Sequence, residues 1–340
     1  MRAMRLHQTG EMDGRRSPLR LEELPLPEPA AGEVRIQVHV CAVCHTELDQ
    51  IEGRVATPLP RVLGHQVVGR VDMLGEGVDE SFLGQRVGVG WIGGACGQCR
   101  WCERGEENLC PDFEGTGCDL DGGYAEFMTV NADFIHPIQE ALKDEHAAPF
   151  LCAGAIGLRS LRLTGLNNGQ VLGLTGFGAS NHLVLALARA ILPESPVMVW
   201  ARDSDQREQA LAAGATWAGD TFDDPPDQPD AIIDTTPVWT PIMEALKRLA
   251  PGGRLVINAI SKEAVDRNRL AELDYPAQLW KEKEIKSVAN VTRRDISDFL
   301  ETAATHGFTP EIQTFSLEQA NQALNEIRSG NIRGAKVLIL

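Results

Sequence analysis

The fold of this chain is decided by one stretch of its sequence, Val171-Leu-Gly-Leu-Thr-Gly176-Phe-Gly178-Ala-Ser-Asn181. Residues 171–174 predict a buried strand, and the apolar residues that follow the stretch recur with helical periodicity. The glycine turn between them stands where a dinucleotide-binding fingerprint belongs, although Asn181 replaces its third glycine. Gly176 permits the tight turn, and Gly178 lets backbone N–H groups approach a pyrophosphate. We expect the turn to bind a dinucleotide through residues Gly176, Gly178, Ala179, Ser180 and Asn181.

Short apolar runs and helical patterns continue to alternate beyond this turn. Strands are predicted at 197–200, 231–234 and 254–257, and helices at 205–213 and 241–250. Such a succession of strand and helix is typical of an α/β fold with a doubly wound parallel sheet. We therefore expect a Rossmann dinucleotide-binding domain in the second half of the chain.

The residue after the second strand bears on the choice of cofactor. The acidic residue that would hold the adenosine ribose is missing, and Trp200-Ala-Arg202-Asp203 stands there instead. A small residue followed by Arg202 leaves room and charge for a 2′-phosphate, which favours NADP over NAD. In the alternative interpretation Arg202 stacks on the adenine, and Asp203 or Ser204 caps the next helix.

Length and composition exclude several other classes of protein. The 340 residues correspond to about two domains. Lys plus Arg number 32 against 48 for Asp plus Glu, a formal charge of −16, which argues against nucleic acid or an anionic membrane as the main partner. We see no apolar run of about 18 residues and no signal-peptide pattern, so we expect a cytoplasmic protein without membrane contact.

All eight cysteines lie in the first 152 residues, and four of them share one loop. Two-residue gaps let thiolates turn back on a single ion, and a fourth thiolate closes a tetrahedron with no open position. The sequence therefore predicts a structural zinc site, with an iron–sulfur cluster or incidental thiols as alternatives. The four residues are Cys96, Cys99, Cys102 and Cys110.

A second, dispersed set consists of Cys44, His65 and Cys152. Two thiolates and one imidazole are a ligand set that leaves zinc a fourth position for water or substrate. Each residue is weak evidence when taken singly, because a buried Cys is usually a small hydrophobe and a His beside Gly often serves a turn. Cys41 follows an alternating strand pattern and is predicted to be a core thiol.

Taken together, these motifs resemble those of the zinc-containing medium-chain alcohol dehydrogenases over nearly the whole chain. The bacterial members near the cinnamyl-alcohol branch are the most similar, on the Gly-Phe-Gly-Ala-Ser turn, on Leu151-Cys-Ala-Gly154 and on Ser287-Val-Ala-Asn-Val-Thr-Arg-Arg294. The resemblance implies a GroES-like β-barrel catalytic domain over 1–154 and 291–340, with both zinc sites. It implies a Rossmann domain over 155–290.

The resemblance also implies roles for individual residues. Cys44, His65 and Cys152 look like the catalytic zinc ligands, and Thr46 resembles the hydroxyl that receives the alcohol proton. His45 and Arg333 resemble residues that face the cofactor phosphates.

Two residues depart from the family pattern near the catalytic ligands. Gln66 replaces the usual Glu, and Glu47 replaces the usual Asp. Groups behind zinc ligands orient them and tune the metal, so we expect a reduced or shifted activity. We also expect that Glu47 can still accept a hydrogen bond from His65. Asp49 stands where many relatives carry His, and it either passes a proton or is a solvated helix residue.

The implied enzyme is a zinc-dependent alcohol dehydrogenase or aldehyde reductase. It would hold two zinc ions per chain and transfer hydride between a zinc-bound alkoxide or carbonyl and a nicotinamide cofactor, with a small alcohol or aldehyde as substrate. Relatives are commonly dimers or tetramers, which implies a homo-oligomer. The alternative is a zinc-free or non-catalytic medium-chain relative, such as a quinone-reductase-like protein.

Overall fold

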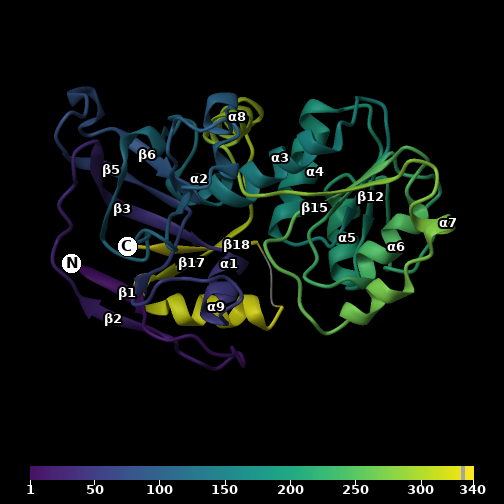
Figure 1. The fold of residues 1–340 in the computed structure, drawn as a ribbon, viewed down its shortest axis with the longest axis horizontal. Coiled ribbons are helices and arrows are strands. Elements are labelled where there is room, and N and C mark those ends of the chain that lie inside the picture. Colours follow the sequence, from purple (N-terminus) through teal and green to yellow (C-terminus); the bar gives the residue numbers. More distant parts are fainter. Residues whose placement is uncertain (331–333) are drawn as a thin grey trace. The chain divides into compact units, whose positions relative to one another are not determined.

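In the computed structural model, which describes residues 1–330 and 334–340, the chain divides into two units (Figure 1). The first unit joins Met1–Ala155 to Asn290–Leu340, and the second is Ile156–Ala289. The first unit is thus built from two stretches of chain separated by the second. Among the described residues, no helix combines the length and the apolar character needed to cross a membrane.

The second unit is built around one sheet of six parallel strands in the order β13-β12-β11-β14-β15-β16. Its strands are β11 (Leu172–Thr175), β12 (Val197–Trp200), β13 (Trp217–Gly219), β14 (Ala231–Asp234), β15 (Arg254–Ile257) and β16 (Glu284–Ser287). The order reverses between β11 and β14, as in doubly wound sheets, where ligands bind beyond the carboxyl ends of the strands. The predicted α/β class with a doubly wound parallel sheet is confirmed.

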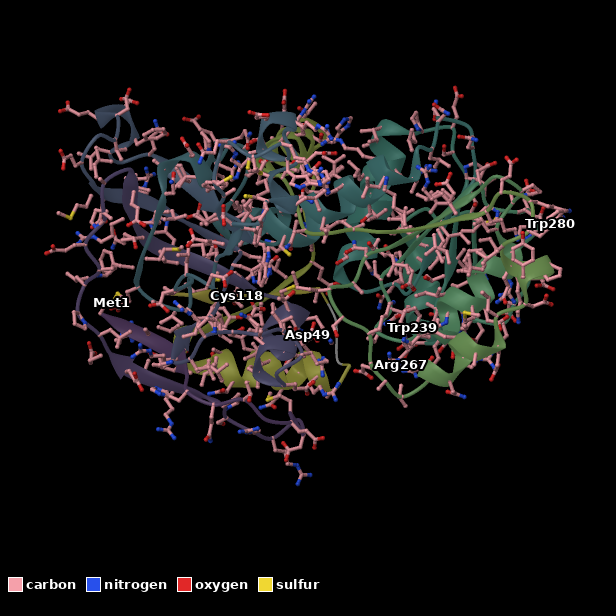
Figure 2. All side chains as sticks on the ribbon, in the orientation of Figure 1. Met1, Asp49, Cys118, Trp239, Arg267 and Trp280 are labelled. Carbon is pink, nitrogen blue, oxygen red and sulfur yellow. The ribbon has the colours of Figure 1, made fainter. Side chains whose placement is uncertain are left out.

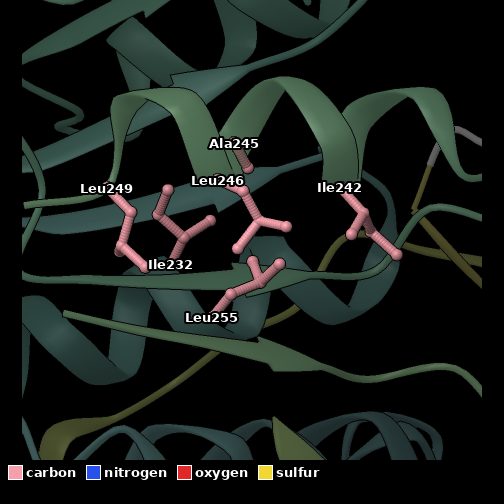
Figure 3. Close-up of a cluster of buried hydrophobic side chains, with 6 residues drawn as sticks. All are labelled: Ile232, Ile242, Ala245, Leu246, Leu249 and Leu255. Atoms are coloured by element: carbon pink, nitrogen blue, oxygen red, sulfur yellow. The ribbon is translucent and has the colours of Figure 1, made fainter. Parts of the chain in front are cut away.

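Helices connect these strands. They are α3 (Ala155–Thr164), which begins at the last residue of the first unit, then α4 (Ala179–Ile191), α5 (Ser204–Ala212), α6 (Thr240–Arg248), η6 (Arg267–Glu272) and α7 (Tyr275–Gln278). Figure 3 shows how α6 buries one face on the sheet: Ile242 and Leu246 of the helix lie over Ile232 of β14 and Leu255 of β15. Ile242 and Leu246 are four residues apart, which places both apolar side chains on the same side of the helix.

The first unit contains a sheet of seven strands, with β10-β6-β5-β3-β18-β17 in sequence and β9 added to β3. A three-stranded sheet (β2-β1-β4) and the pair β7-β8 complete it. The strands are β1 (Arg2–Leu6), β2 (Leu19–Glu23), β3 (Glu33–Val43), β4 (Arg61–Val62), β5 (Val67–Leu74), β6 (Arg86–Val89), β7 (Ile92–Gly94), β8 (Glu114–Gly115), β9 (Phe127–Asn131), β10 (Ile135–Pro137), β17 (Ile312–Ser316) and β18 (Ala335–Ile339).

The helices of the first unit range from single 3₁₀ turns to α8, which has 14 residues. They are α1 (His45–Ile51), η1 (Glu80–Phe82), η2 (Cys102–Arg104), η3 (Glu107–Leu109), η4 (Ala132–Phe134), α2 (Asp144–Pro149), η5 (Phe150–Gly154), α8 (Arg293–His306), η7 (Leu317–Gln319) and α9 (Ala320–Arg328). The α8 helix begins with a capping box between Thr292 and Asp295 and ends at Gly307 in the left-handed conformation.

Strand β3 is the centre of the seven-stranded sheet. Its even-numbered apolar residues, from Val34 to Val40, are buried, as expected for alternation along a strand. β5 pairs with one edge of β3, while the other edge pairs first with β9 and then, antiparallel, with β18 (Figure 1). The carboxyl end of β3 is therefore held on both sides, directly before Cys44.

Candidate active site and metal centres

The four cysteines of the loop converge. Their sulfur atoms all lie within 4.8 Å of one another, with Cys99 and Cys102 3.6 Å apart and Cys96 and Cys110 3.5 Å apart. The backbone N–H of Cys102 is the main cause that lowers the pKa of Cys99 to about 7. An all-thiolate set at these separations has the chemistry of a closed zinc site.

The quartet loop is fastened to helix α8. Glu107, buried in η3, accepts hydrogen bonds from Arg293 N at 2.9 Å and Arg293 Nε at 3.2 Å. The Arg293 guanidinium also lies over the ring of Phe134, 5.0 Å from its centroid. The loop therefore has two supports, its cysteines and this charged contact with the first turn of α8.

Cys44, His65 and Cys152 also converge, although they come from three elements. One potential ligand atom from each lies within 4.8 Å of the others. Cys44 caps α1 after β3, His65 precedes β5, and Cys152 lies in the π-helical turn η5. Isolated π turns occur often at functional sites, because they shift a side chain relative to the regular helix.

Glu47 joins two of these residues. Its Oε2 accepts a hydrogen bond from Cys44 N at 2.7 Å, which completes a capping box at the start of α1. Its Oε1 lies 2.7 Å from His65 Nδ1, and both side chains are fully buried. The longer side chain of Glu, compared with Asp, spans both contacts. His65 Nε2 is buried and has no hydrogen-bond partner in the described parts of the chain, so it is free to bind a metal.

The local electrostatics favour a thiolate in this group. Cys152, followed by His65, holds the pKa of Cys44 well below that of an ordinary thiol. Burial opposes protonation of His65, but Glu47 and Cys44 raise its pKa to about 10. A thiolate is the form in which cysteine binds metals.

Gly64 and Trp91 shape the surroundings of His65. Gly64 has φ +98°, and a Cβ there would lie 2.5 Å from the ring of Tyr124, so a larger residue would collide. The ring of Trp91 packs edge-on against His65 with 4.8 Å between centroids. Trp91 lies near the candidate site in the structure, but its contact with His65 has no signal in the sequence.

The other predicted residues of this site lie in or beside α1. Thr46 Oγ1 is 3.6 Å from Cys44 Sγ, while His45 is exposed at the first position of the helix. Gln66 follows His65 and is buried. The structure thus places Thr46, but not His45, in contact with a candidate ligand.

Asp49 and the two remaining cysteines are also buried. Asp49 is only 4% exposed and pairs with Arg54 at 2.6 Å, so it is not a solvated helix residue. Cys41 lies in β3 with no exposed surface, as predicted for a core thiol. Cys118 Sγ lies 3.4 Å from Ala56 O. Neither cysteine belongs to a metal-ligand group among the described residues.

The glycine turn of the second unit lies between β11 and α4. Gly176 has φ +78°, a left-handed conformation that favours glycine. Gly178 precedes α4, and a Cβ built on it would meet no atom of the described residues within 4 Å. The space beside this N-terminus is therefore open, and the N–H groups of the first helical turn suit a phosphate. Ala179 and Ser180 are the first two residues of α4.

Asn181 and Arg202 differ in exposure. Asn181 is fully buried, and its Nδ2 donates to the carbonyl of Gly176 at 2.7 Å. Arg202 is exposed after β12, while Asp203 Oδ1 accepts from Asp205 N at 2.8 Å and caps α5. The predicted phosphate-facing residue Arg333 lies outside the described residues.

Comparisons with known proteins agree with these features. A family model described as the alcohol dehydrogenase GroES-like domain matches residues 30–140. Over 346 residues the chain is 40% identical to a probable alcohol dehydrogenase AdhA of Mycobacterium tuberculosis (strain CDC 1551 / Oshkosh), covering 100% of this chain and 97% of that protein. It is 30% identical over 336 residues to an alcohol dehydrogenase of Geobacillus stearothermophilus, covering 95% and 96%.

Solved structures show the same architecture. A cinnamyl alcohol dehydrogenase of Sorghum bicolor, SbCAD4, superposes with a TM-score of 0.86 at 26% identity, covering 99% of this chain and 97% of that one. An alcohol dehydrogenase of the archaeon Aeropyrum pernix superposes with a TM-score of 0.87 over 100% of both chains at 22% identity, which speaks to the fold alone. The predicted combination of a GroES-like domain and a Rossmann-type sheet is confirmed.

Proposed function

The chain belongs to the zinc-type medium-chain alcohol dehydrogenase family, and on that premise we propose that Cys44, His65 and Cys152 bind its catalytic zinc. The observation that carries the proposal is the convergence of their three ligand atoms within 4.8 Å, from three separate elements. Two thiolates and one imidazole leave a fourth position for substrate. The unpartnered, buried Nε2 of His65 fits a metal at this position.

The quartet of Cys96, Cys99, Cys102 and Cys110 is proposed to bind a second, structural zinc. Four sulfur ligands close the coordination sphere, so this site has no place for a substrate. Its support for the loop is mechanical, because η2 and η3 bury few apolar side chains of their own.

A zinc ion held by Cys44, His65 and Cys152 would supply Lewis-acid chemistry toward the oxygen of an alcohol or carbonyl. The protein's own residues hold and move the proton. Thr46 Oγ1, half-buried and 3.6 Å from Cys44 Sγ, is proposed to accept a hydrogen bond from the substrate hydroxyl and to pass its own proton on to water as it takes up the substrate's proton. Glu47 Oε1, 2.7 Å from His65 Nδ1, orients the ring so that Nδ1 faces the carboxylate and Nε2 is the nitrogen left for the metal.

The second unit is proposed to bind the nicotinamide cofactor, which supplies the hydride acceptor or donor. Gly176 and Gly178 form the turn, and the open space beside Gly178 fits a pyrophosphate at the start of α4, with Ala179 and Ser180 in its first turn. The exposed Arg202 supports a preference for NADP. His45 and Arg333 remain proposed phosphate-facing residues.

We also propose that the two units have different roles. The unit of Met1–Ala155 and Asn290–Leu340 would be the catalytic domain with both metals, and Ile156–Ala289 the cofactor domain. The six cysteines proposed as zinc ligands have to stay reduced to bind a metal, which supports a reducing, cytoplasmic location.

A homo-oligomer is supported by the outer strand β16. All four of its residues are exposed, among them the apolar Ile285, and Trp280, which precedes β16 in the chain, is exposed as well (Figure 2). An open strand edge with apolar side chains is suited to pairing with a second copy of the chain. Light scattering of the wild-type protein and of Ile285→Lys tests this, because the substitution should favour the monomer.

Metal analysis together with steady-state kinetics tests the proposed function. We expect about two zinc ions per chain, oxidation of alcohols, and reduction of an aldehyde panel with NADPH preferred over NADH. A single zinc per chain would leave only the quartet and favour the alternative of a non-catalytic relative. A wide preference for NADH would overturn the proposed role of Arg202.

A further inference from the structure

The glycine turn is held in place by a side chain that the fingerprint does not provide. Asn181 Nδ2 donates to the carbonyl of Thr175 at 3.1 Å and to that of Gly176 at 2.7 Å. Its Oδ1 is buried and has no donor within the described residues. The amide thus satisfies the carbonyls of the turn while its own oxygen stays unpaired, which costs stability. The Asn181 amide is oriented by its two hydrogen bonds to the backbone carbonyls of Thr175 and Gly176.

The neighbouring strand β14 holds the same backbone from the other side. Thr175 Oγ1 donates to Asp234 Oδ1 at 2.6 Å, and Thr235 N donates to Thr175 O at 3.1 Å. Thr236 Oγ1 donates to Asp234 Oδ1 at 2.7 Å. The Thr175 carbonyl therefore accepts from both Asn181 and Thr235, and the side chain of Thr175 is fixed to Asp234.

Lys262 completes this arrangement. Its Nζ lies 2.5 Å from Asp234 Oδ2 and also donates to Thr236 O. The Asp234 side chain is fully buried and that of Lys262 is 9% exposed. Burying two charges is expensive, and replacing the pair by apolar residues is often neutral or stabilising. Stability alone is therefore a weak reason for this pair.

The position of the Asp234–Lys262 pair in the sheet suggests a role in cofactor binding. β11 and β14 are the adjacent strands between which the order of the sheet reverses, and Thr175 and Asp234 are their paired last residues. Dinucleotides bind beyond the carboxyl ends of the strands at such a reversal. The three side chains thus hold the backbone that a bound pyrophosphate would meet first.

We propose that Asn181, Asp234 and Lys262 are positioning residues that keep Thr175 and Gly176 in the conformation that receives the cofactor. Asn181 then compensates for the missing third glycine, since a turn held in its bound shape loses less entropy on binding. This inference rests on the proposed binding of a nicotinamide dinucleotide. It assigns the three residues no contact with the cofactor.

The experiment measures Kd for NADH and NADPH by fluorescence, using the zinc-loaded protein and the variants Asn181→Ala and Asn181→Leu. Both remove the donor, and Leu keeps the size of the side chain. We expect Kd for the preferred dinucleotide to rise about 10-fold in each, as for a loss of one to two hydrogen bonds. The dinucleotide KM should rise in parallel, while the alcohol KM and the zinc content stay unchanged.

Gln209→Ala is the matched control, because it removes an exposed amide from α5 of the same unit and should leave Kd within about twofold. Folded Asn181 variants with wild-type Kd would overturn the proposal and leave Asn181 a purely structural role. Should neither variant fold, Thr175→Val decides: it removes only the hydroxyl that reaches Asp234 and should raise Kd roughly threefold, whereas an unchanged Kd overturns the proposal. A wild-type protein that binds neither dinucleotide overturns the proposed function itself.

Discussion

The quartet of cysteines comes from one loop, whereas Cys44, His65 and Cys152 come from three elements far apart in the chain. Spacing along the loop brings the quartet together locally, so its geometry depends little on the rest of the fold. The dispersed trio converges only when β3, β5 and the η5 turn are in place. One site is therefore a property of a short segment, and the other a property of the whole unit.

The two sites also differ in their surroundings. Three of the four quartet cysteines are half-buried, and their neighbours are backbone N–H groups of the same loop. The trio has a fully buried imidazole, with Glu47 at one nitrogen and Trp91 against the ring. A site that only holds a loop needs no such support, while a site that must orient a reacting group does.

The largest expected effect is on activity when the trio loses a ligand. Cys152→Ser should lower kcat/KM at least about 1000-fold, since several kcal/mol of Lewis-acid stabilisation are lost. The zinc content should fall from two per chain to one while the protein stays folded. Cys118→Ala is the matched control, because it removes a buried thiol outside both groups and should retain activity. Full activity in Cys152→Ser would refute the assignment of this site.

Loss of the quartet should act on stability instead. Cys99→Ser should lower Tm by roughly 10 °C, because a structural zinc site contributes several kcal/mol to folding. Activity per folded molecule at 25 °C should stay near the wild-type value. Glu103→Ala, an exposed change in the same loop, should leave Tm unaltered. Should Cys99→Ser lose activity while keeping its Tm, the division of roles between the two sites would be reversed.

A third test concerns His136, a buried histidine beside α8, the helix to which the quartet loop is fastened. His136 in β10 is buried, and its Nδ1 lies 3.0 Å from Ser297 Oγ of α8. Burial, and then the charge of Arg293, lower its pKa from 6.5 to about 4, against a smaller opposing effect of Glu107. The unfolded chain therefore binds the proton at a higher pH than the folded protein does.

It follows that the free energy of unfolding falls as the pH drops from about 6.5 to about 4, by about 3 kcal/mol in total, and that this effect is absent above pH 7. Urea unfolding across this range measures it, with His136→Gln as the reference that lacks the titrating group. Parallel pH curves for the two proteins would contradict the assignment.

The smallest expected effect comes from Gln66, the buried neighbour of His65 and one of the two residues that depart from the family pattern. Gln66→Glu places a carboxylate at a buried position next to His65 and should change turnover or zinc retention by a few-fold, less than the 10- to 100-fold typical of removing such a partner. Gln66→Met separates the loss of the amide from the gain of charge. No change in turnover, pH profile or zinc retention would remove Gln66 from the account of activity.

Sequence periodicity predicted the fold class of the second unit, but it did not predict all of the strands. The predicted strands at 197–200, 231–234 and 254–257 coincide with β12, β14 and β15, because each is a short apolar run between helices. β16 has a single apolar residue, Ile285, and all four of its residues are exposed, so it lacks the apolar run that predicts a buried strand. The seven-stranded sheet also escapes such reasoning, since β3 and β18 pair across nearly the whole chain.

The candidate sites show the same limit. Individual residues such as Cys44 and Cys152 could be singled out from motifs, but their convergence could not be derived from spacing. Trp91 gave no signal, because its role depends on the fold around His65. Asn181 looked like a defect of the fingerprint, and the partners Asp234 and Lys262 come from other segments of the chain. Contacts between distant segments need the tertiary structure.

The placement of β18 has a consequence for the order of events during biosynthesis. Residues 335–339 form the strand beside the carboxyl end of β3, directly before Cys44. All three trio residues are synthesised before residue 153, yet the sheet that supports them closes only after residue 335 has been made. The second unit, continuous in the chain, can fold in the interval, since domains generally fold as units while synthesis continues. The sheet that supports the trio is therefore completed only at the end of synthesis, when the second unit can already have folded.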